Sequence, residues 1–121
     1  MGAAEDAGAS AFIADLAEQG IEARVDGPAV VYGIEAVAGA RVGTAVGTAV
    51  SINELGGWPA LPPHWVHFPE EVRFESTNTD NVDCLPGWLR HSRDIGAWSM
   101  DRPPALNWLA HVRGLVSGAI G

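Results

Sequence analysis

The spacing of apolar residues changes after residue 20, from a helical period to short β-type runs. Phe12, Ile13, Leu16 and Ala17 recur at three- and four-residue intervals. This spacing predicts an amphipathic helix over residues 10–19, which Ser10 is placed to cap and Gly20 to end.

A helical period returns near the end of the chain. Pro103-Pro104 suits the first turn of a helix, and Asp101 is positioned to cap it. The apolar face of this second predicted helix consists of Ala105, Trp108, Leu109, Val112, Leu115 and Val116.

Between the helices, β-branched and small residues alternate in short runs bounded by turn residues. The predicted strands are, in order, residues 21–25, 29–34, 41–52 and two short runs, 66–68 and 71–75. Asp26-Gly27 is a hairpin-turn signal between the first two. The pattern predicts one α+β domain over residues 1–121, with an antiparallel meander of about four strands between two helices.

Composition narrows the function classes. The chain has 121 residues, enough for one core, and 47% of them are apolar. Its net charge of −8 argues against nucleic acid as a partner, because phosphate backbones need a basic surface. No run is long and apolar enough to span a membrane, and the acidic start does not resemble a secretory signal. With a single cysteine, the sequence predicts a cytoplasmic protein.

The most unusual segment is the strap, residues 56–63, which contains Trp58-Pro59-Ala60-Leu61-Pro62-Pro63. Proline fixes φ and lacks a backbone donor, so this segment is expected to be stiff and extended rather than helix or interior strand. The strap is interpreted either as a functional wall leading to Cys84 or as a loop closed over the core.

The strap and the residues after it resemble a signature of ubiquitin-conjugating (UBC-like) enzymes. In that family an aromatic-Pro-x-x-Pro-Pro strap precedes a Phe, and the catalytic Cys follows about sixteen residues later, commonly with Leu after it. Here Phe68 precedes Cys84 by sixteen residues, and Leu85 follows. The Trp-Arg block, residues 88–98, resembles a segment of the bacterial branch labelled prokaryotic family E. The resemblance covers residues 55–117.

This resemblance implies a conjugating protein that carries a ubiquitin-like modifier as a Cys84 thioester and passes it to an amine. It also implies a partner activating enzyme of the adenylating type, with no metal or organic cofactor. The family's His-Pro-Asn tripeptide is absent, and Ser76-Thr77-Asn78 stands in its place. The alternative is therefore a catalytically inactive UBC-like or RWD-like adaptor that binds a partner through the strap and the Trp-Arg block.

The residues themselves suggest roles of the same kind. Cys84 is the candidate nucleophile, because thioester exchange needs an accessible thiolate, but lone cysteines are often small buried apolar groups. Asn78 and Asn81 are candidate oxyanion donors or simple turn residues, and Asp94 or Asp83 is a candidate base. His91 is expected to face either the thiol or solvent. A zinc site formed by Cys84 with His64, His67 and His91 is an alternative.

The candidate partner-binding residues are aromatic, proline and arginine side chains, types that favour protein interfaces: Trp58, Pro62, Pro63, Trp88, Arg90 and Arg93. Residues 88–98 are expected to form a partly ordered loop on the closing helix. Arg90 and Arg93 are expected to pair with acidic neighbours, namely Asp94, Asp101, Glu70 or Glu71.

Overall fold

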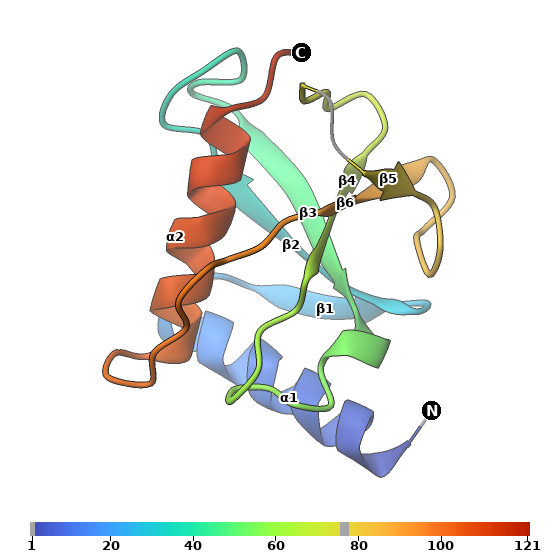
Figure 1. Cartoon of the computed structure of the whole chain (residues 1–121), viewed down its shortest axis with the longest axis vertical. Coiled ribbons are helices and arrows are strands. Elements are labelled where there is room, and N and C mark those ends of the chain that lie inside the picture. Colours follow the sequence, from blue (N-terminus) through green and yellow to red (C-terminus); the bar gives the residue numbers. More distant parts are fainter. Residues whose placement is uncertain (1, 76–77) are drawn as a thin grey trace.

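A computed structural model describes residues 2–75 and 78–121, with two helices beside an antiparallel sheet (Figure 1). Ser76 and Thr77, which stand where the UBC-like tripeptide would be, lie outside the described residues. The elements are α1 (Ala3–Glu18), β1 (Ala23–Asp26), β2 (Ala29–Glu35), β3 (Ala45–Ser51), the 3-10 turn η1 (Ile52–Glu54), β4 (Trp65–Pro69), β5 (Thr79–Asp80), β6 (Trp88–Ser92) and α2 (Pro104–Ser117).

The sheet confirms the predicted antiparallel meander and extends it. Its six strands follow the order β1-β2-β3-β4-β6-β5, so the first four are neighbours in sequence as well as in space. The hairpin at Gly27 is confirmed, since Asp26 pairs with Ala29 and Gly27 has a φ of 56°. Residues 71–75 were predicted to form a strand, but they do not. Residues 88–98 were predicted to form a loop, but the first five of them form strand β6.

The start of α1 differs from the prediction, whereas the start of α2 matches it. α1 begins at Ala3 rather than near residue 10, because the alanine-rich segment before Ser10 favours helix without an apolar stripe. α2 begins at Pro104, so the two prolines open the helix as predicted, but its N-cap is Pro103 with no side-chain cap, and the prediction that Asp101 caps it is wrong. Neither helix is long and apolar enough to cross a membrane, as far as the described residues go.

The two helices cover one face of the sheet, which is termed the helix face. Phe12 of α1 and Trp108 of α2 are fully buried against Tyr32 of β2, and the Trp108 indole donates a 2.8 Å hydrogen bond to the Tyr32 hydroxyl. On this face, β2 and β3 contribute paired positions such as Val30 opposite Val50. The main hydrophobic core therefore lies between the helices and the sheet.

The opposite face of the sheet, termed the outer face, carries a smaller apolar cluster. Ala29, Val31 and Ala49 are buried there, with Leu85 and Trp88 packed against them. A Cβ on Gly47 would lie 3.3 Å from the Trp88 ring, so a glycine at this strand position leaves room for the indole. The segment between β5 and β6 is thereby held against the outer face.

Two helical glycines give a matched test of this packing. In α1, a Cβ on Gly8 would overlap the backbone carbonyl oxygen of Leu55, whereas a Cβ on Gly114 of α2 would meet open space. We expect Gly8→Ala to lower the free energy of unfolding by roughly 1–3 kcal/mol, because α1 must move away from the chain after η1. Gly114→Ala should raise it by roughly 0.5–1 kcal/mol, since alanine favours helix.

Urea denaturation of both variants measures these changes directly. Equal effects of the two substitutions would contradict the close approach of α1 to Leu55.

Candidate functional site

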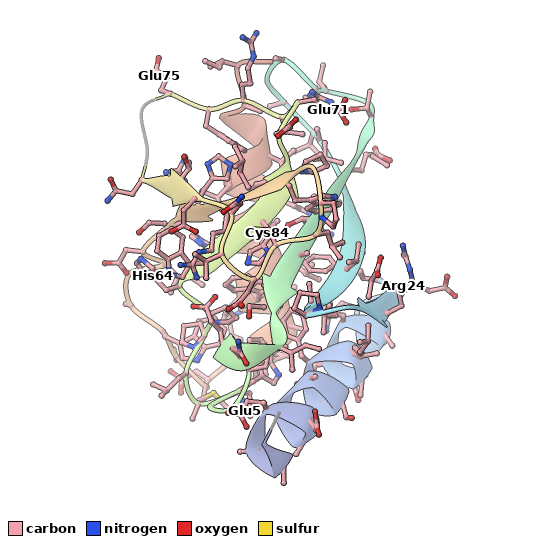
Figure 2. All side chains as sticks on the ribbon, turned by 90° about the vertical axis from the view of Figure 1, so that its right-hand side faces the viewer. Glu5, Arg24, His64, Glu71, Glu75 and Cys84 are labelled. Carbon is pink, nitrogen blue, oxygen red and sulfur yellow. The ribbon has the colours of Figure 1, made fainter. Side chains whose placement is uncertain are left out.

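Cys84 lies in the loop between β5 and β6, over the outer face of the sheet (Figure 2). Turn residues shape this loop: Asp83 has a φ of 56° and Gly87 a φ of 80°. The Cys84 backbone amide donates to the Asn81 backbone carbonyl at 3.2 Å. The side-chain amide of Asn53 donates to the Asp83 carboxylate at 3.1 Å. The loop is therefore tied both to itself and to η1, which fixes the position of the thiol.

The group in contact with the thiol is His67 of β4. Cys84 Sγ lies 3.6 Å from His67 Nδ1, and the His67 side chain is fully buried. Strand register places His67 opposite Ala49 on one side and Arg90 on the other, so all three share the outer face. His67 was predicted from sequence only as a possible zinc ligand, and its pairing with Cys84 is a new observation.

Burial leaves both members of this pair uncharged at neutral pH. Burial raises the pKa of the Cys84 thiol to about 11; Arg90 opposes this shift, while Asp80 and Asp83 add to it. Burial, reinforced by Arg90, lowers the pKa of His67 to about 4. At pH 7 a thiol with that pKa is ionised in roughly one molecule in ten thousand. The resting site thus contains a neutral thiol beside a neutral imidazole.

Arg90 of β6 is the charged residue at the centre of the site. Its guanidinium binds Asp80 of β5 through Nε–Oδ1 and Nη2–Oδ2 contacts of 2.6 and 3.2 Å, and it stacks 4.0 Å from the Trp65 ring centroid. Pairing with Arg90 lowers the pKa of the Asp80 carboxyl. The expected ion pair of Arg90 is therefore present, but its partner is Asp80 rather than the acidic residues closest in the predicted loop.

Of the other candidate catalytic residues, Asn81 meets Cys84 through its backbone carbonyl and not through its side-chain amide. Asn78 and Asn81 are exposed, and Asp94 accepts a 2.8 Å hydrogen bond from the Gly96 amide. His91 points to the helix face, where its ring lies 4.9 Å from Phe74 and 5.8 Å from Phe68. The expectation that His91 faces the thiol or solvent is wrong. Successive side chains of a strand point to opposite faces of the sheet, so His91 points to the helix face and Arg90 to the outer face.

The same separation affects the zinc alternative. His67 and Cys84 lie on the outer face and His91 on the helix face, so the proposed ligands do not converge. Among the described residues, no three His, Cys, Asp or Glu side chains lie close enough together to hold a metal ion.

The strap, residues 56–63, is pinned mainly by inward-pointing tryptophans. The Trp58 indole donates to Asp15 of α1 at 2.9 Å and is almost fully buried against Phe12. Trp98 of the Trp-Arg block donates to the Pro59 carbonyl at 2.9 Å and contacts the Trp58 ring. These contacts match the interpretation of the strap as a loop closed over the core. The expected extended conformation is wrong over residues 56–60, which form turns.

The remaining candidate partner-binding residues are buried or half-buried. Pro63 is buried, and Pro62 and Trp88 are half-buried. Arg93 is half-buried over the Phe74 ring, with its guanidinium 5.5 Å from the ring centroid, and donates to the Ser92 carbonyl. The most exposed large apolar residue of the strap is Leu61, at 67% exposure, which sequence reasoning did not select.

Comparison with protein-family models, with curated proteins and with solved structures finds no match for this chain. The structure shows an α+β fold with two helices and a six-stranded antiparallel sheet. The UBC-like assignment remains a prediction from sequence.

Proposed function

We propose that this chain is a protein-binding adaptor domain of UBC-like type, which holds a component of a ubiquitin-like modifier pathway without forming a thioester itself. The observation that carries the proposal is the exposed Leu61 on a strap whose neighbours are fixed inward. A large apolar side chain presented by a rigid segment binds a partner at low entropic cost.

The surroundings of Leu61 support an interaction surface. The Leu61 amide donates to the Gly57 carbonyl at 2.9 Å, which closes a turn at this part of the strap. Met100, on the segment that follows Trp98, is a second large apolar residue with 54% exposure. Because Trp98 bonds to Pro59, the strap and this segment are held to each other. Together they offer two apolar anchors on connected, well-fixed loops.

The state of the thiol also favours binding over transfer. Nucleophilic attack needs a thiolate, but the pKa of Cys84 is raised to about 11 and the adjacent imidazole is neutral. The candidate amide donors Asn78 and Asn81 are exposed, and neither bonds to the thiol. An adaptor does not require these groups to be activated.

The test uses a ubiquitin-like protein and an activating enzyme of the adenylating type, each titrated separately against this chain by calorimetry. We expect Leu61→Ser to weaken the bound complex by roughly tenfold or more, as removal of a buried anchor does. Val42→Ser is the matched control, because Val42 is a similarly exposed residue, at 58%, on another loop. Binding that is equally tight for wild type and Leu61→Ser would contradict the proposal.

A second candidate function is thioester carriage, and the 3.6 Å contact between Cys84 Sγ and His67 Nδ1 favours it. Imidazole at this position accepts the thiol proton if a bound partner alters the site. Incubation with modifier, activating enzyme and ATP distinguishes the two functions. A reducible conjugate that Cys84→Ala abolishes would establish the carrier, whereas binding without a conjugate supports the adaptor.

A further inference from the structure

β1 is one edge of the sheet, with β2 as its only strand neighbour among the described residues. The two-residue turn after β1 makes Asp26 and Ala29 the closing pair, which in such hairpins exchanges both backbone hydrogen bonds. Hydrogen-bonded and non-hydrogen-bonded pairs alternate along an antiparallel ladder, so the backbone groups of Arg24 also bond to β2, opposite Val31. The backbone groups of Ala23 and Val25 are consequently directed away from β2, toward the free edge.

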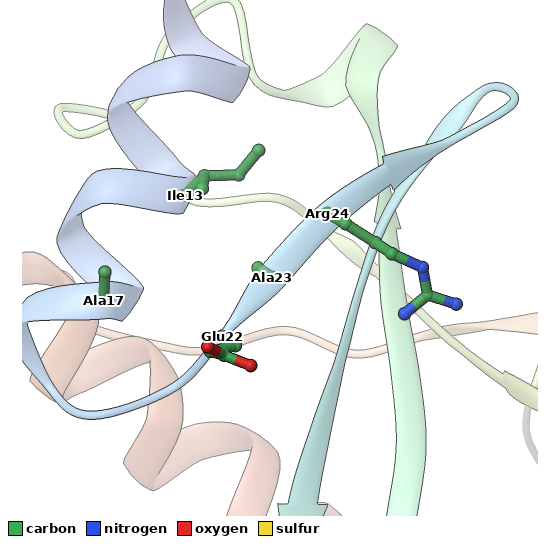
Figure 3. Close-up of a pocket in the computed structure, with 5 residues that line it drawn as sticks. All are labelled: Ile13, Ala17, Glu22, Ala23 and Arg24. Atoms are coloured by element: carbon green, nitrogen blue, oxygen red, sulfur yellow. The ribbon is translucent and has the colours of Figure 1, made fainter.

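A groove of about 390 Å³ runs beside this edge, between α1 and β1 (Figure 3). Ile13 and Ala17 line it from α1, and Ala23 and Arg24 line it from β1, together with Glu22 just before the strand. Val25, next along the strand, is 55% exposed. The groove thus combines unpaired strand backbone with an apolar wall, which are the two features that bind an extended peptide.

Charge around the groove favours a basic occupant. α1 carries no lysine or arginine; of its acidic residues, Asp6 and Glu18 are exposed, whereas Asp15 accepts a hydrogen bond from Trp58 of the strap. Along the strand, the exposed sequence Glu22, Arg24, Asp26 places one positive charge between two negative ones. Arg24 pairs with Val31, so these three alternate positions belong to the outer face, whereas Ala23 and Val25 belong to the helix face.

We propose that this groove binds an extended, basic segment of a partner protein, which adds a strand to β1. Apolar side chains of the segment enter the groove beside Ile13 and Ala23, and its basic side chains face Glu22 and Asp26. α1 lies on one side of the groove and β1 on the other (Figure 3). The site is separate from the strap and goes beyond the proposed function.

The pattern of β1 specifies the probe. A fluorescein-labelled peptide Lys-Val-Thr-Val-Lys places its lysines opposite Glu22 and Asp26 and its threonine opposite Arg24. We expect its fluorescence anisotropy to rise on titration with the protein and the affinity to fall as salt is added. The charge-reversed peptide Glu-Val-Thr-Val-Glu should bind at least roughly tenfold more weakly.

Val25→Pro tests strand addition, because proline removes an outward-directed amide without removing a bond to β2. It should abolish binding of the lysine peptide, while the matched control Val25→Thr keeps the amide and should retain it. Methylating the peptide on the nitrogens that pair with β1 leaves the protein unchanged and should likewise abolish binding, whereas methylating the alternate nitrogens should not.

Equal binding of the two charged peptides, or of both methylated peptides, would overturn the proposal. A concentration-dependent dimer in sedimentation, lost in Val25→Pro, would overturn it as well, since the occupant of the edge would then be a second copy of this chain.

Discussion

The Cys84 thiol of the folded protein is expected to carry about 100-fold less thiolate at pH 7 than the same thiol in the unfolded chain. The reason is burial, which raises its pKa from an ordinary value of 9.0 to about 11. Titration of the ultraviolet thiolate absorbance should therefore show a midpoint near 11, and alkylation near neutral pH should be slow until denaturant is added. A midpoint below pH 8 would contradict this picture and favour the carrier function.

Substitutions at the neighbouring charges test the cause of the shift. Arg90 lowers the Cys84 pKa, whereas Asp83 raises it. Arg90→Gln should therefore move the thiol midpoint upward and Asp83→Asn should move it downward. Both variants keep the hydrophobic surroundings of the thiol, so neither should abolish the large shift that burial causes.

The second large effect is a loss of stability in acid, caused by His67. Its pKa is lowered from 6.5 to about 4, so the unfolded state binds the proton more readily than the folded state does. The stabilising contribution is fully present above about pH 6.5 and is lost as the pH falls toward 4. Its full size is about 3 kcal/mol, from the shift in pKa.

Urea denaturation at several pH values measures this loss, and His67→Gln should reduce its steepness between pH 6.5 and 4. His91 and His111 also have lowered pKa values caused by burial, so part of the slope should remain in the variant. An unchanged slope in His67→Gln would show that the imidazole is not held neutral on the outer face.

The parts of the fold that could be predicted from sequence are those with a clear local period. Ala105, Trp108, Leu109 and Val112 repeat at helical spacing and are all buried in α2. The β1–β2 hairpin was predictable because glycine supplies the positive φ of its turn. In such segments, local propensity and tertiary packing favour the same structure.

β6 could not be predicted, because its stability comes from partners distant in sequence. Arg90 and His91 are weak strand formers, but Arg90 is held by Asp80 and Trp65, and His91 packs on Phe68 and Phe74. The Cys84–His67 contact is also a product of tertiary structure, since a loop and a strand meet across seventeen residues. Alternation along residues 65–69 would have separated His67 from Val66 and Phe68, but it does not reveal the loop above it.

The order of the strands has a consequence for how the chain folds. β1, β2 and β3 pair with sequence neighbours, so these hairpins form with little loss of loop entropy. The core contact between Trp108 and Tyr32, by contrast, joins residues 76 positions apart. During synthesis the hairpins can assemble on the ribosome, while the apolar surface around Phe12 and Tyr32 stays uncovered until α2 emerges. A molecule stalled at that stage would expose the apolar helix face of the sheet. Packing of α2 onto that face is therefore the step that protects the chain from aggregation.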